Sequence, residues 1–192
     1  MEYRKTITLK DGRNCIIRNG LAQDGNAARE VFLRTHGETD YLLTYPDETR
    51  MTGEQEAQFL KERTESLDEV ELVAEIDGCL VGTAGIRCLG RMDKIRHRAE
   101  FGIGILRDYW GLGIGRALTE SCLECARAAG YAQLELDVVA ENAPALALYQ
   151  SLGFTEYGRN PRGFRSRRSG WQELVLMRLE LDPGRDCSTI LK

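Results

Sequence analysis

The segment from residue 110 to residue 116 has the composition of a ligand-binding turn: Trp110-Gly111-Leu112-Gly113-Ile114-Gly115-Arg116. Hydrophobic periodicity predicts a strand before this turn and an amphipathic helix that begins near Ile114. N–H groups at the start of a helix have no partner within the helix, so they converge on an anion in front of them. Glycine lets a phosphate approach the backbone closely, because glycine has no Cβ. The turn therefore predicts a phosphate-binding site.

Two common phosphate motifs do not fit this turn. A P-loop needs G-x-x-x-x-G-K-[ST], whose lysine and hydroxyl bind nucleotide phosphates and magnesium, and the turn has neither residue. A dinucleotide-binding turn needs G-x-G-x-x-G, and after Gly111 and Gly113 the third glycine position is Arg116. NAD binding is therefore the second choice, and a turn that only joins a strand to a helix is the alternative without a ligand.

A second segment can bring an amide and a phenol to one side of a short helix: Glu141-Asn142-Ala143-Pro144-Ala145-Leu146-Ala147-Leu148-Tyr149-Gln150-Ser151-Leu152-Gly153-Phe154. Asn142 is a typical N-cap, and Pro144 fits the first helical turn. Tyr149 follows Asn142 by about two helical turns, so both side chains can face one cleft. The alternative is that Asn142 only caps the helix and that Tyr149 is a half-buried core aromatic.

Together the two segments resemble the GCN5-related N-acetyltransferase (GNAT) family, and the resemblance extends from about Ile7 to Leu181. In that family a [QR]-x-x-G-x-[GA] turn binds the pyrophosphate of coenzyme A through its backbone. The chain matches this pattern from Trp110 to Gly115, except that Trp110 stands where Gln or Arg is usual. The resemblance implies that the binding amides are those of Gly111, Leu112, Gly113, Ile114, Gly115 and Arg116.

The second segment is similar to the family's N-x-x-A-x-x-[LF]-Y-x-x-x-G-F sequence. From this similarity we expect Asn142 to contact the pantetheine arm. We expect the hydroxyl of Tyr149 to lie near the thioester sulfur and to protonate the departing thiolate. The family arrangement also implies that N–H groups at the end of the fourth core strand bind the pantetheine and the thioester carbonyl. In this chain those residues are Gly104, Ile105 and Leu106.

Acetyl transfer to an amine also requires a base, because an alkylammonium has a pKa of about 10.4 and only the neutral nitrogen attacks. Glu100, on a strand predicted from Ala99 to Leu106, is the first candidate. Glu135 and Asp137 on the next predicted strand are the reserves. The alternative for Glu100 is an ordinary solvated carboxylate on the surface of the sheet.

Hydrophobic periodicity and turn residues predict the scaffold that positions these segments. Asp-Gly pairs indicate hairpins, and Thr52 with Gln55 forms a capping box. The predicted order is a hairpin over 5–18, a helix over 24–35 ended by Gly37, an irregular segment over 38–51, a helix over 52–66, strands over 70–76, 80–86 and 99–106, a helix over 114–129, a strand over 134–139, a short helix from Asn142, and strands over 154–158 and 171–181 around an arginine-rich loop.

This order predicts a mixed α/β (α+β) fold, in which a central, mixed but mostly antiparallel sheet is flanked by helices. The resemblance implies the acyl-CoA N-acyltransferase fold of the GNAT family. With 192 residues the chain can bury a sizeable core. We expect a single N-acetyltransferase domain over residues 1–182 and a flexible tail over residues 183–192.

Composition and charge limit the classes of partner. A net charge of -4 and a pI near 5.4 give no general attraction to nucleic acids or anionic membranes, so we expect neither as a partner. The sequence has no apolar run of about 18 residues and no signal-peptide pattern, which predicts a cytoplasmic protein. We interpret the six cysteines as thiols. Cys122 and Cys125 then belong to the core rather than to a metal site, and we expect no metal.

The predicted function is that of an N-acetyltransferase that moves an acetyl group from acetyl-CoA, its cosubstrate, to a primary amine of a small molecule or a protein. The transfer is expected to be direct, in a ternary complex, and a homodimer fits this prediction. One alternative is a catalytically silent acyl-CoA sensor, which would not need Tyr149. Another is an RNA-binding module that uses the basic loops.

The sequence gives two opposing indications about the acceptor. Five arginines between Arg159 and Arg168 favour a carboxylate or phosphate on the acceptor, unless they form a solvated loop. Acidic residues of the segment after the first helix favour a polyamine or another cation instead: Glu38, Asp40, Asp47 and Glu48. The acceptor therefore stays open at this point.

Overall fold

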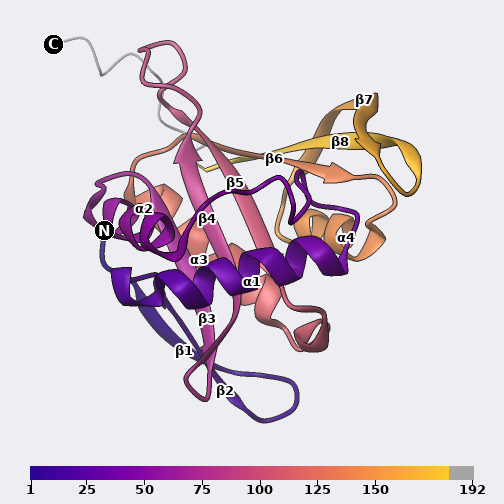
Figure 1. Cartoon of the computed structure of the whole chain (residues 1–192). Helices are drawn as coiled ribbons and strands as arrows, with labels where there is room; N and C mark the ends of the chain where they lie inside the picture. Colours follow the sequence, from indigo (N-terminus) through magenta and orange to yellow (C-terminus); the bar gives the residue numbers. More distant parts are fainter. Residues whose placement is uncertain (182–192) are drawn as a thin grey trace, which may run out of the picture.

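A single sheet of eight strands forms the centre of the fold, in the order β1-β2-β3-β4-β5-β6-β8-β7 (Figure 1). A computed structural model describes residues 1–181, and the tail predicted at 183–192 lies outside them. The strands are β1 Arg4–Thr8, β2 Asn14–Asn19, β3 Val70–Ile76, β4 Cys79–Cys88, β5 Arg98–Ile105, β6 Gln133–Val139, β7 Thr155–Ser166 and β8 Gly170–Glu180. The helices are α1 Gly25–Glu38, α2 Gly53–Glu65, α3 Ile114–Ala128 and α4 Ala143–Ser151.

The sheet is mixed and mostly antiparallel, as predicted. Only β5 and β6 pair in parallel, and every other neighbouring pair is antiparallel. Both predicted hairpins are present, and each turns at its Asp-Gly pair. At the β3–β4 turn, Asp77 and Gly78 have φ of 50° and 79°, the left-handed conformation that a two-residue hairpin needs.

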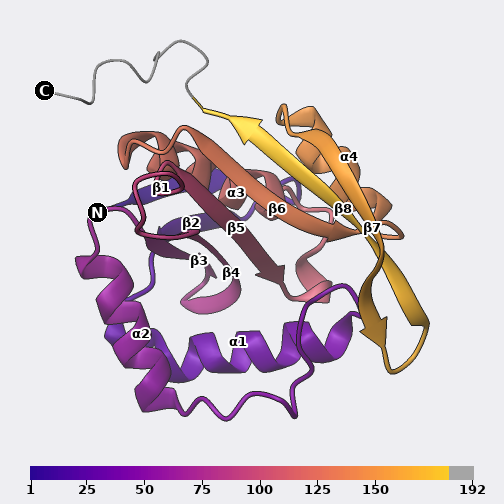
Figure 2. The ribbon, with the colours of Figure 1, turned by 90° about the horizontal axis from the view of Figure 1, so that it is seen from above.

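Helices cover both faces of the sheet, with α1 and α2 on one side and α3 and α4 on the other (Figure 2). α3 buries the apolar side predicted for it, which includes Leu118, Cys122 and Cys125. The two cysteines are therefore core thiols, as interpreted from the sequence. Within residues 1–181 no helix has the length and apolar character that a membrane crossing requires.

The parallel strands β5 and β6 pair over a short stretch only. The register joins Arg98–Glu100 of β5 to Gln133–Glu135 of β6. Beyond it, β5 continues to Ile105 and β6 to Val139, but the two strands no longer pair with each other. β6 stays paired with β8 along its whole length, so it follows β8 and diverges from β5 (Figure 2). The sheet therefore opens between the carboxyl ends of the two strands, which is where open α/β sheets bind ligands.

Two predicted boundaries were wrong. Gly37 does not end the first helix, because α1 continues to Glu38 and stops where Thr39 turns to extended backbone. A glycine inside a helix costs only about 1 kcal/mol, which neighbouring contacts can offset. Most of the arginine-rich segment is not a loop, because β7 continues as far as Ser166 and pairs with β8, and only Arg167 and Arg168 lie in the turn that follows. The register of β7 shifts between Asn160 and Phe164, around Pro161, as expected for an edge strand that contains proline.

Candidate active site

The turn before α3 presents a run of backbone N–H groups. The first bond from α3 back to the turn joins the Ala117 N–H to the Gly113 oxygen at 3.1 Å. Gly111 and Gly113 have φ of 77° and 101°, where a residue with a side chain would be strained. Within the described residues, the amides of residues 111–116 have no backbone hydrogen-bond partner. These donors lie together at a helix start, which is the arrangement expected of an anion-binding site.

Trp110 has a structural role that the sequence did not reveal. Its indole Nε1–H donates to the carbonyl oxygen of Ile105 at 2.7 Å. The guanidinium of Arg107 stacks 5.5 Å from the centre of the indole ring. The residue that replaces the usual Gln or Arg therefore connects the turn to the end of β5, next to the opening in the sheet.

The three predicted amides at the end of β5 differ in direction. The Leu106 N–H donates to the Val81 oxygen at 2.9 Å, so it is already bonded to β4. Gly104 lies opposite Thr83 in the same register, and alternation directs its N–H toward β4 as well. The same alternation directs the N–H of Ile105 toward β6. Ile105 is therefore the amide of this group that can serve a ligand in the opening between β5 and β6.

Asn142 caps α4 as predicted. Its Oδ1 accepts from the Ala145 N–H at 3.4 Å, and Pro144 lies in the first turn. The capping bond uses the oxygen of the side chain and leaves its NH₂ group for another acceptor. Asn142 also lies directly after β6, so it flanks the opening from the side opposite Ile105.

Tyr149 lies on the α3 face of the sheet with its ring almost completely buried, and 6% of its surface is exposed. The ring meets Phe101 of β5 edge-on at 6.1 Å and Phe154 at 5.8 Å. Burial raises the pKa of the Tyr149 phenol above its usual value. The hydroxyl therefore stays protonated at neutral pH, as a proton donor must.

Glu100 lies on the opposite face of β5 from Tyr149. Its neighbours Ala99 and Phe101 point into the core beneath α3, so alternation directs Glu100 toward the side of α1 and α2. Its carboxylate forms an ion pair with Arg87 of β4, at 2.6 Å. The predicted base and the predicted acid thus flank the opening from the two faces of the sheet.

The reserve carboxylates on β6 differ in their surroundings. Glu135 is buried and bonded to Arg98, with Gln133 Nε2 donating to it at 3.0 Å. The carboxylate of Asp137 has no hydrogen-bond partner among residues 1–181. Partial burial raises the pKa of Asp137, and the charges of Glu100 and Glu135 raise it further. Three carboxylates therefore gather on this face where β5 and β6 diverge.

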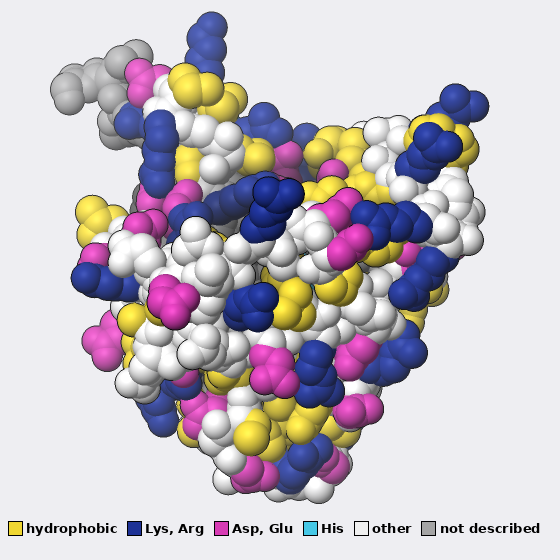
Figure 3. All heavy atoms as spheres, in the orientation of Figure 1, with side chains coloured by type: hydrophobic (Ala, Val, Ile, Leu, Met, Phe, Trp, Pro, Cys, Tyr) yellow, Lys and Arg dark blue, Asp and Glu magenta, His cyan; other side chains and the backbone are white. Residues whose placement is uncertain are grey.

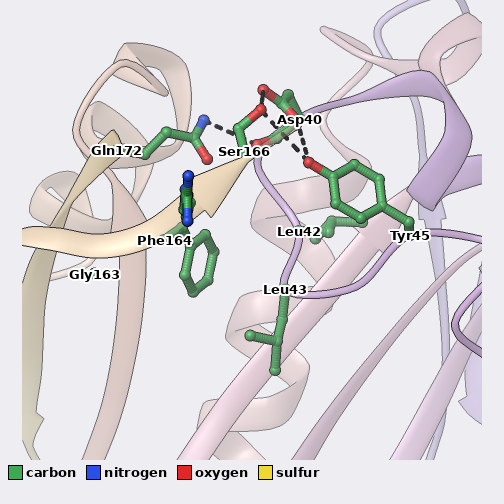
Figure 4. Close-up of a pocket in the computed structure, with 9 residues that line it drawn as sticks. Asp40, Leu42, Leu43, Tyr45, Gly163, Phe164, Ser166 and Gln172 are labelled. Atoms are coloured by element: carbon green, nitrogen blue, oxygen red, sulfur yellow. Dashed lines mark hydrogen bonds between the residues drawn. The ribbon is translucent and has the colours of Figure 1, made fainter. Parts of the chain in front are cut away.

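Two cavities lie between the segment after α1 and the β7–β8 hairpin. The larger one, about 480 Å³, is bounded by residues that follow β5 and β6, among them Arg107, Trp110 and Glu141. Arg168 and Trp171 of the hairpin also line it. The smaller one, about 250 Å³, lies beside Tyr45 and Phe164 (Figure 4). Both have the size of sites for small molecules or for a part of one.

A hydrogen-bond network around Asp40 joins the segment after α1 to the hairpin (Figure 4). Asp40 accepts from Ser166 Oγ at 2.5 Å and from Ser169 Oγ at 3.1 Å. The side chain of Gln172 donates to the Asp40 carbonyl at 3.1 Å. The acidic segment and the arginine-rich strand, which gave opposing indications in the sequence, therefore bind each other.

Two ion pairs cross this contact, and both use Arg167. Arg167 pairs with Asp47 at 2.8 Å and with Glu48 at 3.3 Å, and it stacks on the ring of Tyr45. Within residues 1–181 no group of three His, Cys, Asp or Glu side chains has an arrangement that could bind a metal ion.

Comparison with known proteins identifies relatives of this chain. Residues 30–154 match the model of the acetyltransferase (GNAT) family. The L-amino acid N-acyltransferase MnaT of Escherichia coli is 31% identical over 111 residues, which cover 58% of this chain and 64% of that protein. The match thus spans just under two thirds of the relative.

Solved structures share the fold. An acetyltransferase of the GNAT family from Streptococcus pneumoniae superimposes with a TM-score of 0.79 and 31% identity, over 86% of this chain and 98% of that one. A protein of Salmonella typhimurium, solved with its cofactor acetyl-CoA, gives a TM-score of 0.78 at 24% identity, over 90% of this chain and 96% of that one. With its match to the family model over most of its length, the chain belongs to the acetyltransferase (GNAT) family.

Proposed function

We propose that this protein is an N-acetyltransferase, which transfers the acetyl group of acetyl-CoA directly to a primary amine in a ternary complex. The observation that carries the proposal is the run of unbonded amides over residues 111–116, at the start of α3 and next to the opening between β5 and β6. A pyrophosphate on these amides would direct the rest of coenzyme A toward the opening. The acetyl-CoA in the Salmonella typhimurium protein of the same fold supports this choice of cosubstrate.

The opening gives each substrate its own face of the sheet. The pantetheine arm would run along the side of α3 and α4, bonded by the side chain of Asn142 and the N–H of Ile105. The acceptor would enter from the side of α1 and α2, through the larger cavity. The thioester carbon would then lie in the opening itself, within reach of both.

The reaction in this arrangement forms one C–N bond and breaks one C–S bond. The neutral amine attacks the thioester carbon, and the tetrahedral intermediate collapses with loss of the thiolate. Glu100 takes the amine proton, directly or through water, and Asp137 is the second candidate because no side chain neutralises it. Tyr149 gives its hydroxyl proton to the thiolate and regains one from solvent.

Purified protein tests the proposal in two steps. Titration calorimetry with coenzyme A should give a dissociation constant below 1 mM, roughly the range of ordinary cosubstrates. Acetyl-CoA mixed with a panel of amines should then release free thiol. Affinity without thiol release would identify a silent sensor, and the absence of both would remove the proposal.

The mixed charge on one face of the molecule argues against a nucleic-acid partner at that face. Lysine and arginine side chains alternate with aspartate and glutamate on the face in Figure 3. A polyanion needs a continuous basic surface, so we propose an amine acceptor as the partner. We also propose that the protein is cytoplasmic and that it forms a homodimer, as expected from the sequence. Light scattering of the purified protein would test the dimer.

A further inference from the structure

The larger cavity contains charged groups that are already engaged and others that are not. Glu38 accepts from the Arg107 N–H at 2.7 Å, and its own carbonyl oxygen accepts from the Arg107 guanidinium. Asp40 accepts from the two serines of the hairpin. These groups hold the walls of the cavity together, so they are poorly available to a ligand.

Arg168 and Glu141 also line this cavity, and neither side chain has a hydrogen-bond or ion-pair partner within residues 1–181. They come from two segments of the chain: Arg168 from the β7–β8 turn and Glu141 from the residues after β6, next to the bond between the Ala140 N–H and the Glu173 oxygen of β8. The position of Arg168 is fixed, because its backbone N–H donates to Ser166 Oγ at 2.8 Å, within the Asp40 network. The cavity thus offers one unpartnered cation and one unpartnered anion in its lining, within the described residues.

The other arginines of the hairpin differ from Arg168. Arg159 pairs with Glu156 and Glu173, and Arg167 pairs with the acidic segment. Arg162 and Arg165 each stack 5.4 Å from the ring centre of Trp171. Among the hairpin arginines, Arg168 alone combines an unpartnered guanidinium, within the described residues, with a place on the larger cavity.

We propose that the acceptor is a small zwitterion, an amine that carries a carboxylate, such as an α-amino acid, with Arg168 binding its carboxylate and Glu141 its ammonium. This inference rests on the proposed acetyltransferase function. The planar guanidinium of Arg168 matches a carboxylate with two parallel hydrogen bonds. Glu141 adjoins Asn142, so the amine that it binds lies on the thioester side of the cavity. Trp110 and Trp171 supply apolar walls for the rest of the acceptor.

Steady-state kinetics of thiol release from acetyl-CoA tests this acceptor class. The probes are the twenty amino acids of proteins. For the best of them, two derivatives are also tested: its carboxamide, and the amine that lacks the carboxyl group. We expect the amino acid to have a KM at least about tenfold lower than that of its amide, the size of one charge-assisted contact. Arg168→Gln should raise the KM for the acid by about tenfold, change kcat less than threefold, and leave the KM for the amide within twofold.

Arg159→Gln is the matched control, because it removes the same charge from the same hairpin at a residue outside both cavities, whose ion pairs with Glu156 and Glu173 do not involve a cavity residue. It should leave both KM values within twofold. Glu141→Gln should raise the KM for the acid and the amide alike, since both carry the ammonium.

Equal KM values for acid and amide in the unaltered protein, or an equal effect of Arg168→Gln on both, would overturn the inference. Thiol release with peptides or diamines but with no amino acid would also overturn it and leave the acetyltransferase function intact. An absence of coenzyme A affinity would instead remove the function itself.

Discussion

The two halves of the site are built in different ways. The cosubstrate half consists of the turn over residues 110–116, the end of β5, and α4, and it relies on backbone amides and buried rings. The acceptor half consists of the segment 39–52 and the β7–β8 hairpin, and it relies on exposed side chains. Its Asp40–Ser166 bond joins residues 126 positions apart. The cosubstrate half is thus local in the sequence, whereas the acceptor half forms only on folding.

Tyr149→Phe is the sharpest test of the cosubstrate half. We expect kcat to fall about a hundredfold, because the thiolate loses its proton donor. A tenfold fall is the smallest that supports this role. The affinity for coenzyme A should stay within twofold, since the ring and its contacts with Phe101 and Phe154 persist. Single-turnover thiol release and calorimetry measure the two effects. An unchanged kcat would remove Tyr149 from the chemistry.

Gly113→Ala should reduce coenzyme A affinity about tenfold, because a Cβ strains a residue with φ of 101° and obstructs the approach to the amides. Gly130→Ala is the matched control at the other end of α3, where φ is 81° and a Cβ also meets no protein atom within 4 Å. Both variants carry similar strain, so both should unfold at a lower temperature. If both lost affinity equally, the effect would be one of stability and not of the turn.

Glu71→Gln tests a carboxyl group that belongs to neither half. Glu71 lies on β3 beneath α2, and burial raises its pKa from 4.5 to about 7. The native state therefore binds the proton more tightly than the unfolded state, and stability falls as pH rises from 4.5 to 7. The variant lacks this penalty. Denaturant unfolding should show it more stable by about 3 kcal/mol at pH 8 and nearly unchanged at pH 4.

If Glu71→Gln stabilised the protein more at pH 4 than at pH 8, the result would contradict the predicted pH dependence. Activity serves as the control, because Glu71 lines neither cavity. The kcat and both KM values of the variant should therefore match those of the unaltered protein at pH 8.

Asp40→Asn should have the smallest effect of these variants, and that effect should be confined to the acceptor half. An amide accepts weaker hydrogen bonds from Ser166 and Ser169 than a carboxylate does, so the hairpin becomes less firmly positioned. We expect the KM for the acceptor to rise about threefold and the affinity for coenzyme A to stay unchanged. Asp47→Asn is the control, since its exposed pair with Arg167 is worth little. A loss of coenzyme A affinity in either variant would show that the halves are coupled.

Much of the cosubstrate half could be predicted because its signals are local. Three alternate glycines define the turn, Asn142 and Pro144 define the start of α4, and Asp-Gly pairs define the hairpins. Each of these choices is decided by backbone conformation over a few residues. The direction of the amide donors at the end of β5 was missed, because it depends on which neighbour the strand pairs with. That pairing directs the N–H of Leu106 to Val81 and leaves that of Ile105 for the opening.

The sequence by itself determined the order of elements, the glycine turn and the candidate acid, since these follow from short-range backbone preferences and hydrophobic periodicity. Tertiary structure alone decided where β5 and β6 diverge and which charges neutralise each other. It paired Arg167 with Asp47, bonded Asp40 to the hairpin and left Arg168 and Glu141 unpartnered within the described residues. Coulomb and hydrogen-bond energies depend on distances between side chains, and residues more than a hundred positions apart acquire those distances only when the sheet is assembled.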